Sequence, residues 1–384
     1  MSQYRDRTNQ RRMTIILGIV LTVAMGSSLV LPLLRSAATG SGAIEPTALP
    51  TATVPAPVDV TSIAFDQSYI HPSGIFTATI PEAWQPDEGV TTSSEAIVTL
   101  RNNAALSLGE LRVIEPTDGV ADLDAVSAYF NTNWLNSSWR DYASWDEATR
   151  DVRDDELVID FNLSSRGQNY IARQIATTDG ERIYVARAVF PENSPEQVRY
   201  LVENLKANLH FNDQFAGEPF DWTAYYDSTS GHIIRFPQTW QITDAAPGAP
   251  ASIEGAGGIV LRVESADEAI TSTDEAAAYI ESTRPGAEIV SATETEHNGL
   301  SGFSVVYSLP TLDGPSQSGY ALILTDENGS VHVANLRLNE SDVDLTDAAT
   351  LEQYPDIAAV LNSFTVLPSG LGVVAEQPVA DTAG

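Results

Sequence analysis

Gly74-Ile75-Phe76-Thr77-Ala78-Thr79-Ile80-Pro81-Glu82-Ala83-Trp84 is an alternating strand pattern that ends in Pro-x-x-Trp, and Gly231-His232-Ile233-Ile234-Arg235-Phe236-Pro237-Gln238-Thr239-Trp240 repeats it. Asp179-Gly180 and Asn328-Gly329 follow in the two copies, each as the tight turn of a predicted hairpin. Apolar patterns at 202–211 and 357–366 close the copies, with nearly the same separation as the Pro-x-x-Trp units. Three matches in one order predict a duplication.

The first copy shows strands interrupted by two helices. Period-two alternation predicts strands near residues 76–80, 96–100, 106–114, 157–163, 169–176 and 183–190. One helix is predicted from apolar residues with helical spacing behind a capping Asp122, namely Leu123, Val126, Phe130 and Trp134. Ser194, Pro195 and Gln197 predict a capping box at the start of the second helix.

The second copy repeats this order of elements. Ser272 and Glu275 predict a capping box, and a last helix is expected near 357–361 behind Pro355. Strands are expected near 289, 303–309, 320–324 and 331–338. Strand hairpins interrupted by helices indicate the α+β class, with an antiparallel sheet and helices packed on it.

The N-terminus carries a signal for the membrane. Four arginines, Arg5, Arg7, Arg11 and Arg12, precede an uncharged run at 13–34. As a helix this run reaches about 33 Å, enough for a hydrocarbon core of ~30 Å, whereas the apolar part of a cleaved signal peptide has about 7 to 15 residues. We therefore expect a basic cytoplasmic tail at 1–12 and a transmembrane signal anchor at 13–34, with all later residues extracytoplasmic. Cleavage at the small residues 36–38 is the alternative.

The remaining boundaries follow from composition. Residues 35–61 form a Pro/Thr/Ala-rich linker, and residues 368–384 are expected to be a disordered tail. Between them lie two predicted domains, at 62–213 and 214–367. Of the 384 residues, 20 are basic and 52 acidic, for a net charge of -32. This charge argues against a nucleic-acid partner, and the lack of cysteine excludes disulfides and thiol chemistry.

Recognisable catalytic motifs are missing from the sequence. The five histidines show no ligand spacing, there is no nucleophile elbow or phosphate loop, and Lys206 is the only lysine. We therefore expect no enzyme activity, cofactor or metal. Two acidic stretches, at 151–156 and 342–347, leave an acidic hydrolase or a calcium-dependent protein as the alternative, although both lack the glycine and distal glutamate of an EF-hand.

An aromatic cluster follows the first predicted helix and has no counterpart in the second copy. Trp134 belongs to the apolar stripe of that helix, while Trp139, Tyr142 and Trp145 form a possible interaction surface. Packing in the core is the other interpretation of Trp139 and Trp145. If both were exposed, a carbohydrate-binding surface protein would be a further alternative function.

The opening strand with its Pro-x-x-Trp, the helix after three strands, the hairpin series and the closing helix resemble the PsbP-like family, which includes LpqN-type surface lipoproteins. The resemblance implies two tandem α-β-α sandwich domains that serve as an exported or membrane-tethered accessory module, binding other proteins without catalysis. The cysteine to which the lipoprotein members attach their lipid is missing here, so the transmembrane anchor would take over that task. Pro81, Trp84, Pro237 and Trp240 then have structural roles. We expect a membrane-anchored, extracytoplasmic binding or assembly module with a protein partner.

Overall fold

The computed structural model describes residues 54–311, 314 and 316–371. The predicted cytoplasmic tail, the signal anchor at 13–34, most of the linker and the end of the C-terminal tail lie outside the described residues. Within the described part, none of the helices is both long enough and apolar enough to span a membrane. We refer to residues 62–213 as the first half and to residues 214–367 as the second half.

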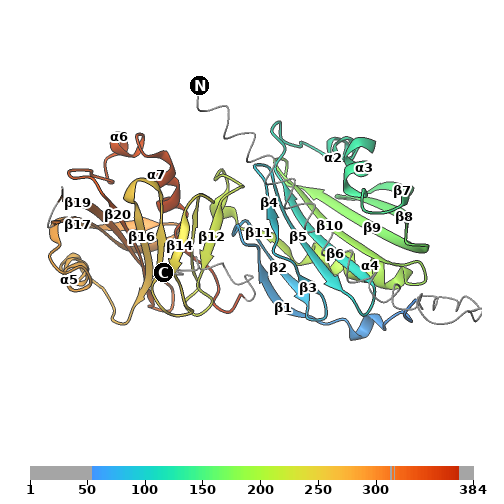
Figure 1. Cartoon of the computed structure of the whole chain (residues 1–384), viewed down its shortest axis with the longest axis horizontal. Helices are drawn as coiled ribbons and strands as arrows, with labels where there is room; N and C mark the ends of the chain where they lie inside the picture. The colour runs from blue at the N-terminus through green and yellow to red at the C-terminus, as the bar shows by residue number, and fades with distance from the viewer. Residues whose placement is uncertain (1–53, 312–313, 315, 372–384) are drawn as a thin grey trace, which may run out of the picture. The chain divides into compact units, whose positions relative to one another are not determined.

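The first half folds into two antiparallel sheets (Figure 1). The small sheet has the order β1-β2-β11, from β1 (Phe65–Ile70), β2 (Phe76–Pro81) and β11 (Leu209–Phe211). The large sheet has the order β3-β5-β6-β10-β9-β8-β7, with β4 beside β5. Its strands are β3 (Gln85–Pro86), β4 (Val90–Thr91), β5 (Glu95–Asn102), β6 (Ser107–Ile114), β7 (Ser144–Arg153), β8 (Glu156–Ser165), β9 (Gln168–Thr178) and β10 (Ile183–Pro191).

The second half repeats this arrangement. Its small sheet has the order β12-β13-β21, from β12 (Thr223–Tyr226), β13 (His232–Phe236) and β21 (Thr365–Val366). Its large sheet has the order β14-β15-β16-β20-β19-β18-β17. These strands are β14 (Gln241–Asp244), β15 (Ala251–Glu254), β16 (Val260–Ala266), β17 (Glu288–His297), β18 (Leu300–Leu309), β19 (Gln317–Thr325) and β20 (Val331–Leu338). The antiparallel sheets expected from the alternating patterns are therefore present in both halves.

The Pro-x-x-Trp units take the chain from the small sheet to the large sheet. The amide of Trp84 donates to the carbonyl of Pro81 at 2.9 Å, and Trp240 donates to Pro237 at the same distance. A proline has no amide for the next ladder bond, so strand pairing stops there. Both indoles are buried in the core, as expected for structural residues.

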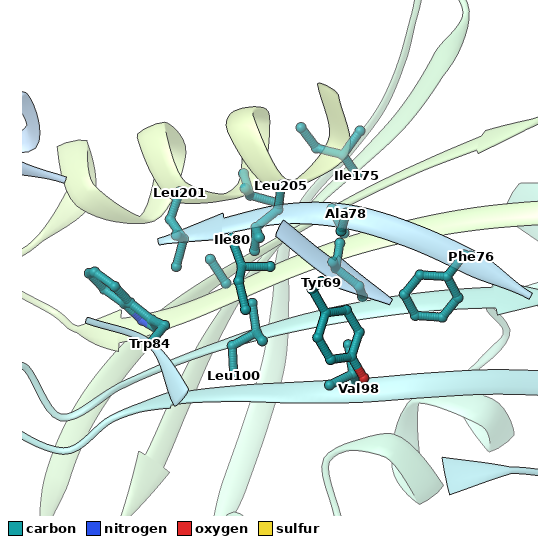
Figure 2. Close-up of a cluster of buried hydrophobic side chains, with 14 of the residues drawn as sticks. Tyr69, Phe76, Ala78, Ile80, Trp84, Val98, Leu100, Ile175, Leu201 and Leu205 are labelled. Atoms are coloured by element: carbon teal, nitrogen blue, oxygen red, sulfur yellow. The ribbon is translucent and has the colours of Figure 1, made fainter. Parts of the chain in front are cut away.

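Helices cover the large sheet of the first half on both faces (Figure 1). Alternate residues of β10 face opposite ways, so Val185 packs with α2 (Leu123–Tyr129) and α3 (Thr132–Ser138), while Ala186 packs with α4 (Pro195–Ala207). Figure 2 shows the second of these layers, where Ile80 of β2 and Leu205 of α4 meet Leu100 of β5. The strand alternation of the sequence thus becomes two apolar layers on one sheet.

The second half has the same two layers. One face of β20 packs against α5 (Thr273–Thr283), and the other packs against the small sheet and α7 (Pro355–Asn362). The short α6 (Ala348–Leu351) precedes α7. The helix order is therefore repeated together with the strand order.

The helix predicted through Phe130 and Trp134 is in fact two helices. Asp122 caps α2 as expected, accepting from the amide of Ala125 at 2.9 Å. At Asn131 the backbone leaves the helical conformation, and the side chain accepts from the amides of Asn133 and Trp134 at 3.0 and 3.2 Å. An asparagine that caps a new helix ends the old one, so a single helix over this stretch was a wrong prediction.

At α5 the predicted capping box forms in a shifted version, in which the glutamate reaches the amide of the residue before the N-cap Ser272. Ser272 accepts from the amide of Glu275 at 3.2 Å, and Glu275 accepts from the amide of Thr271 at 2.7 Å. At α4, by contrast, Ser194 makes no side-chain cap, and Gln197 donates to the carbonyl of Val58 at 2.6 Å. Val58, near the end of the predicted linker, lies at the start of α4, so Gln197 hydrogen-bonds to it instead of completing the capping box.

A buried arginine joins the two halves. Arg235 of β13 is 0% exposed, and its Nε donates to the carbonyl of Ser73 in the first half at 2.7 Å. Its terminal nitrogens reach Glu218 Oε2 at 3.0 Å and the carbonyl of Pro219 at 2.6 Å. An apolar cluster surrounds this contact and contains Ile70, Phe215, Ala224, Tyr226 and Ile233. Every nitrogen of the guanidinium group is thereby satisfied, as a buried cation requires.

Candidate functional site: an aromatic hollow in the first half

A hollow of about 400 Å³ lies in the first half, where the end of α3 meets β5, β6, β9 and β10. We call it the aromatic hollow. Its walls combine aromatic, apolar and polar residues, including Leu106, Ser107, Glu110, Ser138, Trp139, Tyr142, Tyr170 and Arg187. Two of the three residues predicted as an interaction surface therefore line one hollow.

Arg187 of β10 forms the charged centre of the aromatic hollow. It is 3% exposed, and its guanidinium carbon lies 4.3 Å from the ring centre of Trp139. It donates twice to Gln174 Oε1, at 2.6 and 3.2 Å, and once to Ser138 Oγ, at 2.8 Å. Burial lowers the pKa of Arg187 to about 10, so the side chain remains cationic at neutral pH.

Arg187 belongs to a network of four charged side chains, two arginines and two glutamates. Glu110 Oε1 lies 3.5 Å from Arg187 and 3.1 Å from Arg112, and Arg112 also pairs with Glu95 at 3.1 Å. Burial alone would raise the pKa of Glu110, but the two arginines lower it below its ordinary value. Glu110 and Arg187 line the hollow, and Arg112 and Glu95 extend their network away from it, so two cations are balanced by two anions.

Trp139 lies in the core instead of on an open surface. It is 2% exposed and packs edge-on against Phe161 at 5.0 Å and Tyr142 at 5.6 Å. Of the two interpretations of Trp139, the structure therefore supports packing in the core, and the same ring also lines the hollow. A carbohydrate platform that needs both Trp139 and Trp145 in solvent loses one of its two rings.

Tyr142 and Trp145 are half-buried against the same cluster. The ring of Tyr142 lies 6.3 Å from that of Tyr170, and burial raises the pKa of the Tyr142 hydroxyl to about 12. Trp145, on β7, packs 6.3 Å from Phe161 and is not among the residues that line the hollow in the part of the chain described. Of the predicted residues Trp139, Tyr142 and Trp145, Tyr142 both lines the hollow and is partly exposed.

Sequence reasoning missed the charged residues of the hollow. The sequence did contain a signal for Arg187, because this arginine interrupts the apolar run of β10. A lone arginine on a buried strand needs a charged or polar partner. The partner, Glu110, stands directly across on β6. At the corresponding register of the second half, Asn335 faces Arg262, and Asn335 accepts instead from the hydroxyl of Tyr307 at 2.6 Å. The Arg187–Glu110 pair thus belongs to the first half.

The two acidic stretches are placed in turns and strand ends. In the first, Asp151 pairs with Arg153 at 2.9 Å and Glu156 pairs with Lys206 at 2.7 Å. In the second, Asp344 and Asp347 accept from nearby threonine amides at 2.9 and 3.0 Å. No group of three or more histidine, aspartate or glutamate side chains in the described ranges is arranged to hold a metal ion.

Comparisons with known proteins give similarity at low identity. No family model matches the sequence, and no curated protein matches it. The solution structure of cyanobacterial PsbP (CyanoP) from Synechocystis sp. PCC 6803 is 16% identical, with a TM-score of 0.30, over 40% of this chain and 96% of that chain. The immunity protein TplEi of the T6SS from Pseudomonas aeruginosa is 11% identical over 74% of this chain and 98% of that chain, with a TM-score of 0.25. The Tle4-Tli4 complex matches at 11% identity over 81% of this chain and 100% of that chain, with a TM-score of 0.24.

Proposed function

We propose that this chain is a membrane-anchored, extracytoplasmic binding or assembly module without catalytic activity, built from two tandem PsbP-like domains of the α-β-α sandwich type at 62–213 and 214–367. The observation that carries the proposal is a difference between the two halves, although both have the same strand order. The first half has an aromatic hollow with a paired charge network, and the second half has different residues at the register of Arg187 and Glu110. A repeated scaffold in which the first half alone carries the Arg187–Glu110 pair at this register fits a binding module.

The rim of the aromatic hollow has the chemistry of a protein-binding site. Leu106 is 38% exposed, with a positive φ of 50°, and it lines the hollow together with the half-buried Tyr142 and Tyr170. Exposed Arg101 and Asp141 carry charge on the same rim. Apolar and aromatic anchors with polar groups around them are typical of the centre of a protein interface. We infer that an apolar side chain of a protein partner enters the hollow.

Photo-cross-linking in intact cells tests this site. A photoreactive amino acid replaces Leu106 on the rim in one variant, and in the matched control it replaces Val290 of β17, which is 69% exposed in the second half. We expect a discrete product of higher mass from the Leu106 variant and none of that mass from the Val290 variant. Equal products from both positions, or none from Leu106 while both variants reach the membrane, would contradict binding at the hollow.

Digestion of intact cells with an impermeant protease tests the topology. The uncharged run at 13–34 behind four arginines supports an anchor with residues 62–367 outside. We expect these residues to be degraded in intact cells, whereas a cytoplasmic marker protein is not. Full protection of residues 62–367 in intact cells, with degradation after lysis, would place the module inside and overturn the localisation.

A further inference from the structure

Two histidines distant in sequence meet in the second half. His232 begins β13 of the small sheet, and His332 lies on β20 of the large sheet. Both are 0% exposed, and their ring centres lie 5.8 Å apart with the planes at 77°. The sequence spacing of the two histidines does not reveal the pair, because they lie on strands of different sheets. Their contact therefore joins the two sheets.

Each ring has one buried nitrogen without a hydrogen-bond partner. His232 Nδ1 lies 2.8 Å from Ser230 Oγ, while His232 Nε2 has no partner and stands 3.9 Å from Asp227 Oδ2. His332 Nε2 lies 3.5 Å from Asp326 Oδ2, and its Nδ1 has no partner. Neutral rings tolerate this arrangement, but a proton on His232 would place a cation beside the ring of His332, with its nearest carboxylate oxygen, Asp227 Oδ2, 3.9 Å away and not hydrogen-bonded to it.

The titratable groups around the pair come from β12 and from the loops beside it. β12 contributes Tyr225, whose ring centre lies 6.0 Å from that of His232. Asp227 is already held by the amides of Thr229 at 2.8 Å and Gly248 at 3.1 Å. A hollow of about 510 Å³ reaches His332 and carries Asp267, Glu268 and Asp326 on its walls. Water can therefore reach the His332 side of the contact through this hollow. On the other side, burial lowers the pKa of His232 to about 4.

We propose that the His232–His332 contact is an acid-sensitive joint, in which proton uptake at mildly acidic pH loosens β13 from β20 and so separates the small sheet from the large sheet in the second half. The first half has no such joint at the corresponding positions. Phe76 stands where His232 does, since it pairs with Phe211 of β11 as His232 pairs with Val366 of β21. Tyr184 stands in the place of His332, and its hydroxyl donates to Asp179 at 2.6 Å.

The pH dependence has a definite sign. A histidine whose pKa is lowered in the closed state binds its proton more tightly once the joint opens, so the joint is fully stable above about pH 6.5 and weakens as the pH falls toward 4. From pH 7.5 to pH 5.0, proton uptake by His232 alone should raise the opening constant about 30-fold, given its pKa of about 4 when closed.

Hydrogen–deuterium exchange of the full chain at pH 7.5 and 5.0 tests the joint, after correction for the intrinsic pH dependence of exchange. Peptides that cover β13 should lose protection about 30-fold at pH 5.0. The first half holds a buried histidine of its own, His71, whose pKa burial lowers to about 4, so the decisive comparison is between the wild type and the His232 variants at β13. Unchanged protection of β13 at pH 5.0 in the wild type would overturn the proposal.

Variants of His232 decide whether that residue carries the effect. His232→Phe copies the first half and should remove the acid-dependent loss while protection at pH 7.5 is kept. His232→Gln is the second variant if phenylalanine prevents folding, because glutamine does not titrate and retains polar atoms. His210→Gln, at an exposed position of β11, is the matched control and should respond to acid like the wild type. An unchanged acid response in a folded His232 variant would overturn the proposal.

Discussion

Replacing Arg235 with alanine should lower the free energy of unfolding by about 3–5 kcal/mol. The substitution removes three hydrogen bonds at once and leaves Glu218, with a side chain only 11% exposed, without its cation. Burial raises the pKa of Glu218 to about 7, even beside Arg235, so the unpaired carboxylate is costly at neutral pH. Urea unfolding of the wild type and the variant at pH 7.5 gives the difference.

Two further variants show whether the cost arises from the buried pair. Arg153→Ala breaks an ion pair whose side chains are each 52% exposed, and it should change the stability by less than about 1 kcal/mol. The double variant Arg235→Met with Glu218→Gln removes both charges and should recover a large part of the loss. If Arg235→Ala is no worse than Arg153→Ala, the contact of Arg235 with Ser73 does not hold the halves together.

Replacing Gly231 with alanine should cost about 3 kcal/mol or more. Gly231 has a φ of 80°, and a Cβ atom there would lie 2.3 Å from the carbonyl oxygen of Leu367. The neighbouring atom belongs to the backbone, so β21 would have to move away from β13. Thermal and urea unfolding both measure this loss.

Gly180→Ala is the matched control for Gly231→Ala. Gly180 has a φ of 97°, yet a Cβ atom there would meet nothing within 4 Å. This substitution carries only the backbone strain of about 1–2 kcal/mol. Similar losses at the two glycines would show that the contact with Leu367 relaxes at little cost and that backbone conformation alone matters.

The parts of the fold that depend on local patterns could be predicted from the sequence. The duplication, most strands of the large sheets and the caps at Asp122 and Ser272 were visible because alternation and capping act over a few residues. Strand β7 was missed because it is an edge strand, exposed on both sides along most of its length, so apolar alternation is weak there. The Gln197 cap was lost to Val58, a contact with a distant segment.

The sequence indicated the region of the candidate site but not which residues meet there. The density of aromatic residues pointed to the region of Trp139 and Tyr142, because such a cluster was unmatched in the second copy. The pairing of Arg187 with Glu110 depends on the register of β10 against β6, which no local pattern specifies. The same holds for His232 and His332, which meet only after two sheets pack together.

The order in which each half can fold follows from its small sheet. β2 pairs with β11 and β13 pairs with β21, so the closing strand of each small sheet is synthesised after the entire large sheet. Until that strand arrives, β2 and β13 each expose an unpaired backbone edge, and such edges recruit other chains. Contacts this distant also slow folding. Ribosome-bound chains that end before β11 or β21 should therefore depend on chaperones, and that dependence should cease once the strand has emerged.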